Sequence, residues 1–231
     1  MSETNNDYGA FYAVPIHRTD KWVIEMHGLI ARTLQCFLQD TYGQGIWQTI
    51  AELAKLDFDD FEAMLDYDAR TVEQVVDAAG MCLEKSRDAL LEDVGTYLIT
   101  HPNNEGLRRL MRYGGVDFFD FLHSLEDLPG RTRLAVADLQ LPELELTDSA
   151  PGQFLLSCHS GAAELAGFGF VLVGVLRAMA DDYGALVILD HRGALGEAEV
   201  IDITVVETDF AEGRSFELAA APPPIRRETT S

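Results

Sequence analysis

The sequence predicts an α+β fold, with a helical N-terminal lobe followed by a lobe that holds a small antiparallel sheet and a long helix. Three observations predict it. Apolar residues recur every three or four positions through residues 26–125, which is the spacing of amphipathic helices. After residue 140 the spacing changes to alternation and to β-branched runs. A long apolar segment, residues 168–183, interrupts these strand patterns. Helices and strands that are separated along the chain favour the α+β class.

The predicted N-terminal lobe is almost wholly helical. Gly43 is placed to stop the first helix, and Ser86 is placed to cap a later one. Gly114 and Gly115 separate the last two helices, and the Pro129-Gly130 pair is interpreted as the next break. The expected helices cover residues 26–42, 45–53, 71–83, 86–98, 103–112 and 116–125.

The predicted second lobe alternates strands with the long helix. Pro151 and Gly152 form a turn between the first two strands, and Gly184 ends the helix over residues 168–183. Gly193 and Gly196 lie between two β-branched runs, which indicates a hairpin. The expected strands cover residues 141–146, 153–158, 185–189 and 199–207, with a last strand near residues 215–218.

The chain reads as one domain over residues 23–219, between an N-terminal extension over residues 1–22 and a disordered tail over residues 220–231. Its 231 residues are 47% hydrophobic, which is enough to bury a substantial core. No apolar run approaches the roughly 20 residues of a membrane-spanning helix. No basic segment followed by an apolar stretch directs export, so we expect a cytoplasmic protein.

The charge and the cysteines exclude several kinds of partner. A net charge of −22 repels nucleic acid phosphates and anionic lipid headgroups. The acidic residues are dispersed, which is typical of a solvated surface. Three cysteines, far apart and without a CxxC motif, predict free thiols and neither disulfides nor a zinc site.

Two further motifs fail on inspection. The acidic stretch at Asp57, Asp59 and Asp60 lacks the glycine and the closing glutamate of a calcium-binding EF-hand loop. The sequence SCHSG at residues 157–161 has no glycine before its serine, so it is not the nucleophile elbow of a hydrolase. We therefore expect no enzyme activity.

An ordered set of motifs resembles the heme nitric oxide/oxygen-binding (H-NOX) family. The resemblance covers about residues 26–190. Its motifs are MHGLI at residues 26–30, DTYG at 40–43, LLEDVGTYLI at 90–99, RRLMRYGGVDFFDFLHSLEDLP at 108–129 and LPELEL at 141–146.

This resemblance implies a non-enzymatic gas sensor. Members of the family hold heme iron through a proximal histidine and bind nitric oxide or oxygen on the open face. The resemblance implies heme contacts at Ile30 and Pro142, and a signalling partner in trans such as a histidine kinase or a cyclic-dinucleotide enzyme.

The motifs depart from the family pattern where heme is held. Pro129 occupies the position of the proximal histidine, and a proline cannot ligate iron. The propionate-binding motif of the family, Tyr-x-Ser-x-Arg, corresponds here to Cys158, Ser160 and Ala162, with His159 between the first two. Only Ser160 matches that motif.

Two hypotheses about heme follow. In one, His123 is a substitute iron ligand; it lies six residues before Pro129, so on one continuous helix it would be rotated by about 240° net from the usual direction. Cys158 or His159 would be other ligands, and only one of them can face the pocket because neighbours in a strand point to opposite sides. In the second hypothesis the chain has lost heme and serves as a protein-interaction scaffold or binds another apolar ligand.

Overall fold

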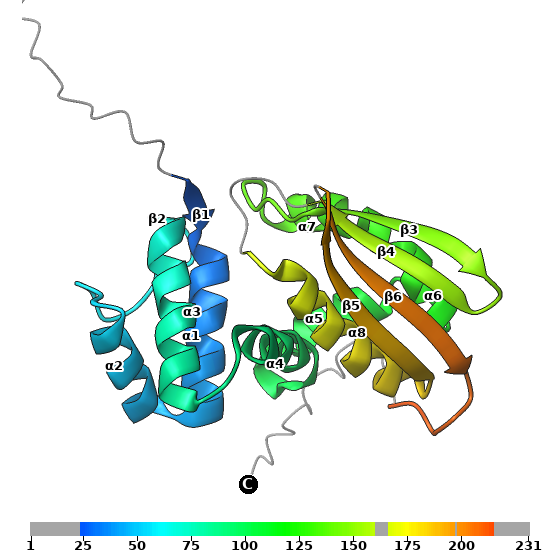
Figure 1. Cartoon of the computed structure of the whole chain (residues 1–231), viewed down its shortest axis with the longest axis horizontal. Helices are drawn as coiled ribbons and strands as arrows, with labels where there is room; N and C mark the ends of the chain where they lie inside the picture. Colours follow the sequence, from blue (N-terminus) through cyan, green and yellow to red (C-terminus); the bar gives the residue numbers. More distant parts are fainter. Residues whose placement is uncertain (1–23, 160–165, 197, 215–231) are drawn as a thin grey trace, which may run out of the picture.

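The computed structural model describes residues 24–159, 166–196 and 198–214. Among these residues the helices come first and the main sheet follows, as an α+β fold requires. Figure 1 shows the helical lobe on one side, the larger sheet on the other, and α4 and α8 between them. The elements of the helical lobe are β1 (Glu25–His27), α1 (Gly28–Tyr42), α2 (Gln44–Leu53), β2 (Asp66–Asp68), α3 (Ala69–Leu83) and α4 (Arg87–Thr100).

The second lobe is built from short helices, four strands and one long helix. Between the lobes the chain passes through a 3-10 turn, η1 (Pro102–Asn104), and α5 (Glu105–Arg112). The second lobe contains α6 (Phe118–His123), η2 (Ser124–Asp127), α7 (Leu128–Ala135), β3 (Glu143–Ala150), β4 (Gln153–His159), α8 (Phe168–Tyr183), β5 (Leu186–Leu195) and β6 (Ala198–Glu207).

The structure confirms several helix ends. The Ser86 hydroxyl caps α4 by accepting a hydrogen bond from the Ala89 amide. Gly184 ends α8 with a φ of 79°, in the left-handed region that favours glycine. The sequence-based interpretation of the Pro129-Gly130 pair as a break is wrong, because Pro129 lies in the first turn of α7. A proline is tolerated there because the amide hydrogen that it lacks would have no helical partner.

Other predictions require correction. His123 and Pro129 do not share a helix, since His123 ends α6 and Pro129 lies in the first turn of α7. The short antiparallel pair β1–β2 was not expected, and β5 continues through Gly193 to Leu195. The strand expected near residues 215–218 lies outside the described residues.

The larger sheet is antiparallel throughout, with the strand order β3-β4-β6-β5. One face packs against α8 and the short helices, where Phe154, Leu156, Cys158, Ile201 and Ile203 are buried. An antiparallel sheet of this kind leaves its other face to solvent. The second lobe therefore has its own hydrophobic core, which we call the sheet core.

The helical lobe has a separate core, the helical core, in which α1, α2, α3 and α4 bury residues such as Phe37, Trp47 and Val75. Helices α4 and α8 join the two cores. A Cβ atom at Gly174 of α8 would lie 2.0 Å from the Glu92 carbonyl oxygen of α4, and a Cβ at Gly95 would lie 2.0 Å from the Val171 carbonyl oxygen. The two helices therefore cross with their backbones in contact, which only glycine allows at these positions.

Candidate functional site

The heme contacts expected from the sequence are distributed over both lobes of the described structure. Ile30 is half-buried and packs against the helical core. Cys158 is fully buried in the sheet core, and Pro142 is buried just before β3. His159, the neighbour of Cys158 in β4, is exposed, so the two side chains point to opposite sides of the strand as expected. Ser160 lies outside the described residues.

His123 lies at the surface of the second lobe. Its side chain is 55% exposed, and Nε2 is 3.9 Å from Asp148 Oδ1. The imidazole meets the Phe154 ring edge-to-face, with the ring centroids 5.8 Å apart. An axial ligand needs a nitrogen directed into a dry pocket, whereas this imidazole sits beside a carboxylate in solvent.

His191 is the buried imidazole of the described residues, with its side chain 8% exposed. The Gly193 amide donates to Nδ1 at 3.2 Å, so Nδ1 is an acceptor and Nε2 carries the proton. Nε2 is 3.0 Å from Glu199 Oε2, and the ring stacks on Phe170 at 3.9 Å. Both ring nitrogens are therefore engaged within the protein.

The carboxylate of Glu199 has a second role at the start of α8. It accepts hydrogen bonds from the Gly167 and Gly169 amides at 3.1 and 2.9 Å. A helix N-terminus carries partial positive charge and free amide hydrogens, so it is stabilised by a carboxylate. Glu199 thus links β6 to α8 while it fixes the ring of His191.

The remaining described histidines serve local contacts. Nδ1 of His27 accepts from the Leu29 amide at the start of α1. Nδ1 of His101 accepts from the Asn103 amide, and its ring lies 4.8 Å from that of Tyr97. Nε2 of His159 lies 3.5 Å from Glu145 Oε2, and the His159 side chain is half exposed. In the described part of the chain no group of three or more histidine, cysteine or acidic side chains is arranged to hold a metal ion.

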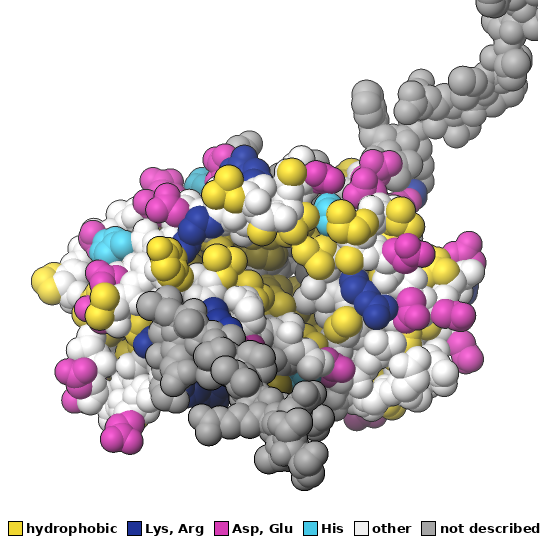
Figure 2. All heavy atoms as spheres, turned by 180° about the vertical axis from the view of Figure 1, so that it is seen from behind, with side chains coloured by type: hydrophobic (Ala, Val, Ile, Leu, Met, Phe, Trp, Pro, Cys, Tyr) yellow, Lys and Arg dark blue, Asp and Glu magenta, His cyan; other side chains and the backbone are white. Residues whose placement is uncertain are grey.

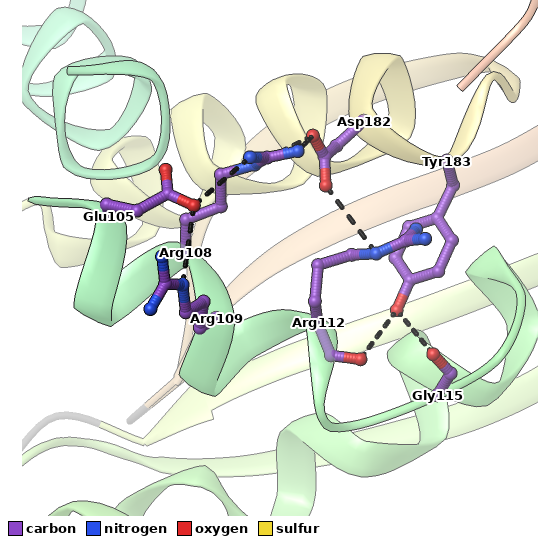
Figure 3. Close-up of polar contacts among 7 residues, drawn as sticks. All are labelled: Glu105, Arg108, Arg109, Arg112, Gly115, Asp182 and Tyr183. Carbon is purple, nitrogen blue, oxygen red and sulfur yellow. Dashed lines mark hydrogen bonds and ion pairs between the residues drawn. The ribbon is translucent and has the colours of Figure 1, made fainter. Parts of the chain in front are cut away.

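A buried ion cluster joins α5 to the end of α8 (Figure 3). Asp182 is 1% exposed, and its Oδ1 accepts two hydrogen bonds from Arg108, at 2.9 Å from Nε and 2.6 Å from Nη2. Nε of Arg112 lies 3.6 Å from Asp182 Oδ2, which is too long for a hydrogen bond. Burial disfavours the charge of Arg108, but the hydrogen bonds to Asp182 raise its pKa above the ordinary value.

Tyr183 completes this cluster. The Arg112 guanidinium lies over the Tyr183 ring, with Cζ 3.8 Å from the ring centre. The Tyr183 hydroxyl donates a hydrogen bond to the Gly115 carbonyl oxygen at 2.9 Å. Burial is the main reason why the pKa of Tyr183 is raised. The cluster borders a pocket of about 520 Å³ whose other lining residues include Asp117, Phe119, Asp209 and Arg214.

The cluster was not predicted from the sequence, because the acidic residues were interpreted as solvated surface. The available signal was the pair Arg108 and Arg112, one helical turn apart on a short helix. A second signal was the position of Asp182 near the end of an otherwise apolar helix. The cluster explains how α5 is attached to α8.

The surface of the molecule agrees with the composition. Figure 2 shows acidic side chains scattered over one face and a hollow near its centre with hydrophobic side chains in its lining. Cys36, Cys82 and Cys158 form no disulfide bond with one another. None of the described helices has the length and apolar character needed to cross a bilayer.

Comparison with known proteins places the chain in a family. The family model described as Haem-NO-binding matches residues 27–190. Soluble guanylate cyclase 89Da of Drosophila melanogaster is 21% identical over 161 residues, which are 70% of this chain and 24% of the cyclase. Soluble guanylate cyclase 89Db of the same fly is 20% identical over an equal length. The chain therefore spans about a quarter of the length of these relatives.

Solved structures show the same fold. A mutant H-NOX protein from S. oneidensis in the Fe(II) ligation state aligns with a TM-score of 0.66 at 15% identity, over 79% of this chain and 97% of that one. An Fe(II) unliganded H-NOX mutant from K. algicida aligns with a TM-score of 0.65 at 17% identity. The alignment covers 79% of this chain and 97% of that one. The match of the family model over most of the chain, together with this fold, shows that the chain belongs to the Haem-NO-binding (H-NOX) family.

Proposed function

We propose that this protein is a non-catalytic regulator that signals to a separate partner protein, as its family resemblance implies. The observation that carries the proposal is the H-NOX fold over residues 27–190, in a family that includes gas sensors. A histidine kinase or a cyclic-dinucleotide enzyme is the partner class that we expect. Within the family, heme and a diatomic gas are the first ligands to test.

The outer face of the larger sheet is the surface that we propose for docking. Ile188 of β5 lies opposite Thr204 of β6, and Val206 follows two residues later, so all three point to the same face. The side chains of Ile188 and Val206 are 61% and 54% exposed. Exposed apolar side chains near one end of a solvated sheet face are typical of interaction surfaces.

The charge around these residues favours one kind of partner. Asp190 and Asp202 are paired across β5 and β6 on this face, where Arg192 forms an ion pair with Asp202, and Glu207 is exposed at the end of β6. With a net charge of −22 on the whole chain, a partner with a basic rim around an apolar centre is complementary. Such complementarity accelerates association and makes it sensitive to salt.

The test uses purified candidate kinase or cyclic-dinucleotide enzyme from the same organism. We expect the protein to bind and to change the rate of partner autophosphorylation or cyclic-dinucleotide turnover. Ile188→Asp is expected to weaken binding by about tenfold or more, since burying an unpaired charge at the centre of an interface costs at least about 1.4 kcal/mol. Met81→Asp is the matched control, because Met81 is 69% exposed on α3 of the other lobe.

The results separate the alternatives. Binding without any change in partner activity would favour the scaffold hypothesis over regulation. Equal binding by the Ile188→Asp and Met81→Asp variants would remove the sheet face from the proposal. If neither partner class binds, the proposed function fails.

A further inference from the structure

Pro129 decides how this chain relates to heme. It occupies the sequence position that the family resemblance gives to the iron ligand, and it is buried in the first turn of α7. Its ring nitrogen is part of the peptide backbone and has no lone pair for a metal. The helix around it is intact: Thr132 Oγ1 donates to the Leu128 carbonyl oxygen, and Arg133 Nε donates to that of Pro129. The position has become an ordinary helix start.

The space beside Pro129 has the wrong chemistry for a porphyrin. A pocket of about 270 Å³ adjoins the proline. Four charged side chains line it: Glu126, Asp127, Arg133 and Glu143. Heme is held by an axial ligand in an apolar cavity, with cations reserved for its two propionates. Three carboxylates beside the ligand position would repel propionates instead.

No described histidine replaces the missing ligand. The buried imidazole, His191, uses both nitrogens inside the protein. His123 and His159 lie at the surface beside carboxylates, and His27 and His101 accept backbone hydrogen bonds at helix starts. Among the described residues, therefore, no imidazole is both buried in an apolar environment and able to offer a nitrogen to iron.

We infer that this chain has kept the H-NOX fold without histidine-ligated heme, and that it acts on its partner independently of nitric oxide and oxygen. The inference rests on the proposed regulatory function and specifies its regulation: the surface that contacts the partner is permanently formed. Backbone contact between α4 and α8 holds the two lobes directly against each other.

The experiment is reconstitution with hemin followed by absorption spectroscopy, with ferrous and nitric oxide-treated samples. The H-NOX protein from S. oneidensis, treated identically, shows that the procedure loads heme. We expect no stoichiometric Soret band from this chain and no change in its Tm with hemin. A stoichiometric band that shifts with nitric oxide would overturn the inference, and loss of that band in His123→Ala or Cys158→Ala would then identify the ligand.

The Pro129→His variant tests the reason for the loss. The first-turn amide hydrogen that histidine adds needs no helical partner, and the neighbouring pocket gives its ring room, so this variant is expected to fold. A Soret band in the variant alone would show that Pro129 abolishes binding. No band in either protein would uphold heme independence but overturn the explanation through one residue.

The partner assay keeps this inference separate from the proposed function. Regulation of the partner that is unchanged by nitric oxide supports both. Regulation that responds to nitric oxide overturns the inference and leaves the function standing. If the protein has no effect on the partner and shows no heme absorption, the proposed function is rejected, whereas the inferred absence of heme stands.

Discussion

The crossing of α4 and α8 gives the most direct test of the fold. Substituting Gly174 by alanine adds one methyl group that would lie 2.0 Å from the Glu92 carbonyl oxygen and 2.8 Å from the Thr96 amide nitrogen. Both atoms belong to the backbone of α4, so no side chain can turn away. An ordinary contact begins near 3.4 Å, so the helices must separate by about 1.4 Å at this point.

The free energy of unfolding should fall by about 2–3 kcal/mol. Overpacking a tight interior costs about 1–3 kcal/mol, occasionally more, and a clash with backbone belongs at or above the upper end of this range. Alanine recovers up to about 1 kcal/mol of helix propensity relative to glycine. For a chain of this size, a net loss of 2–3 kcal/mol lowers Tm by about 4–12 °C.

Urea denaturation followed by circular dichroism, together with calorimetry, measures the effect. Gly106→Ala is the matched control, because Gly106 lies in α5 with nothing within 4 Å of an added Cβ. This control should be neutral or slightly stabilising. If Gly174→Ala were as stable as Gly106→Ala, backbone contact between α4 and α8 could not be what joins the two cores.

Three further predictions concern the buried groups. Asp182→Asn should destabilise the protein by about 3 kcal/mol in urea denaturation, because it removes the buried carboxylate that faces Arg108 and Arg112. The control Asp181→Asn changes an exposed residue and should have little effect. Burial raises the pKa of Tyr97, and its 2.7 Å hydrogen bond to Asp40 raises it further. Above about pH 10 the unfolded chain therefore loses the Tyr97 phenol proton while the native state keeps it. The free energy of unfolding is unaffected by this group below about pH 10 and falls as the pH rises further. Tyr97→Phe should make this fall less steep in denaturation series from pH 8 to 11. Ellman's reagent at pH 8 should modify the half-buried Cys82 first and then Cys36, because burial raises the pKa of the Cys36 thiol. The fully buried Cys158 should react last, as mass spectrometry of the labelled peptides would show. Early labelling of Cys158 would contradict the packing of the sheet core.

The sequence was sufficient to predict the fold class and most elements where one local signal dominates. Ser86 and Gly184 were identified as helix ends because caps and left-handed residues act within one turn. The three-residue strands β1 and β2 were missed because they are too short to show alternation. The helix α7 was missed because proline and glycine usually interrupt helices, although a first turn accepts them.

The candidate site was less predictable because its chemistry depends on tertiary contacts. The departure at Pro129 is visible in the sequence, but the charged pocket beside it is not. Neither the pairing of Asp182 with Arg108 nor that of His191 with Glu199 has a local signature, because the partners lie 74 and 8 residues away along the chain.

Two consecutive residues of β6 hold both ends of the connection between β4 and α8. Ala198 pairs with His159 at the end of β4, and Glu199 binds the amides at the start of α8. The described residues on either side of the connection are therefore both held by β6. For protein engineering, this makes the connection a graft site: a propionate-binding or peptide-binding sequence inserted there would start and finish on anchored backbone, so its closure would cost little entropy.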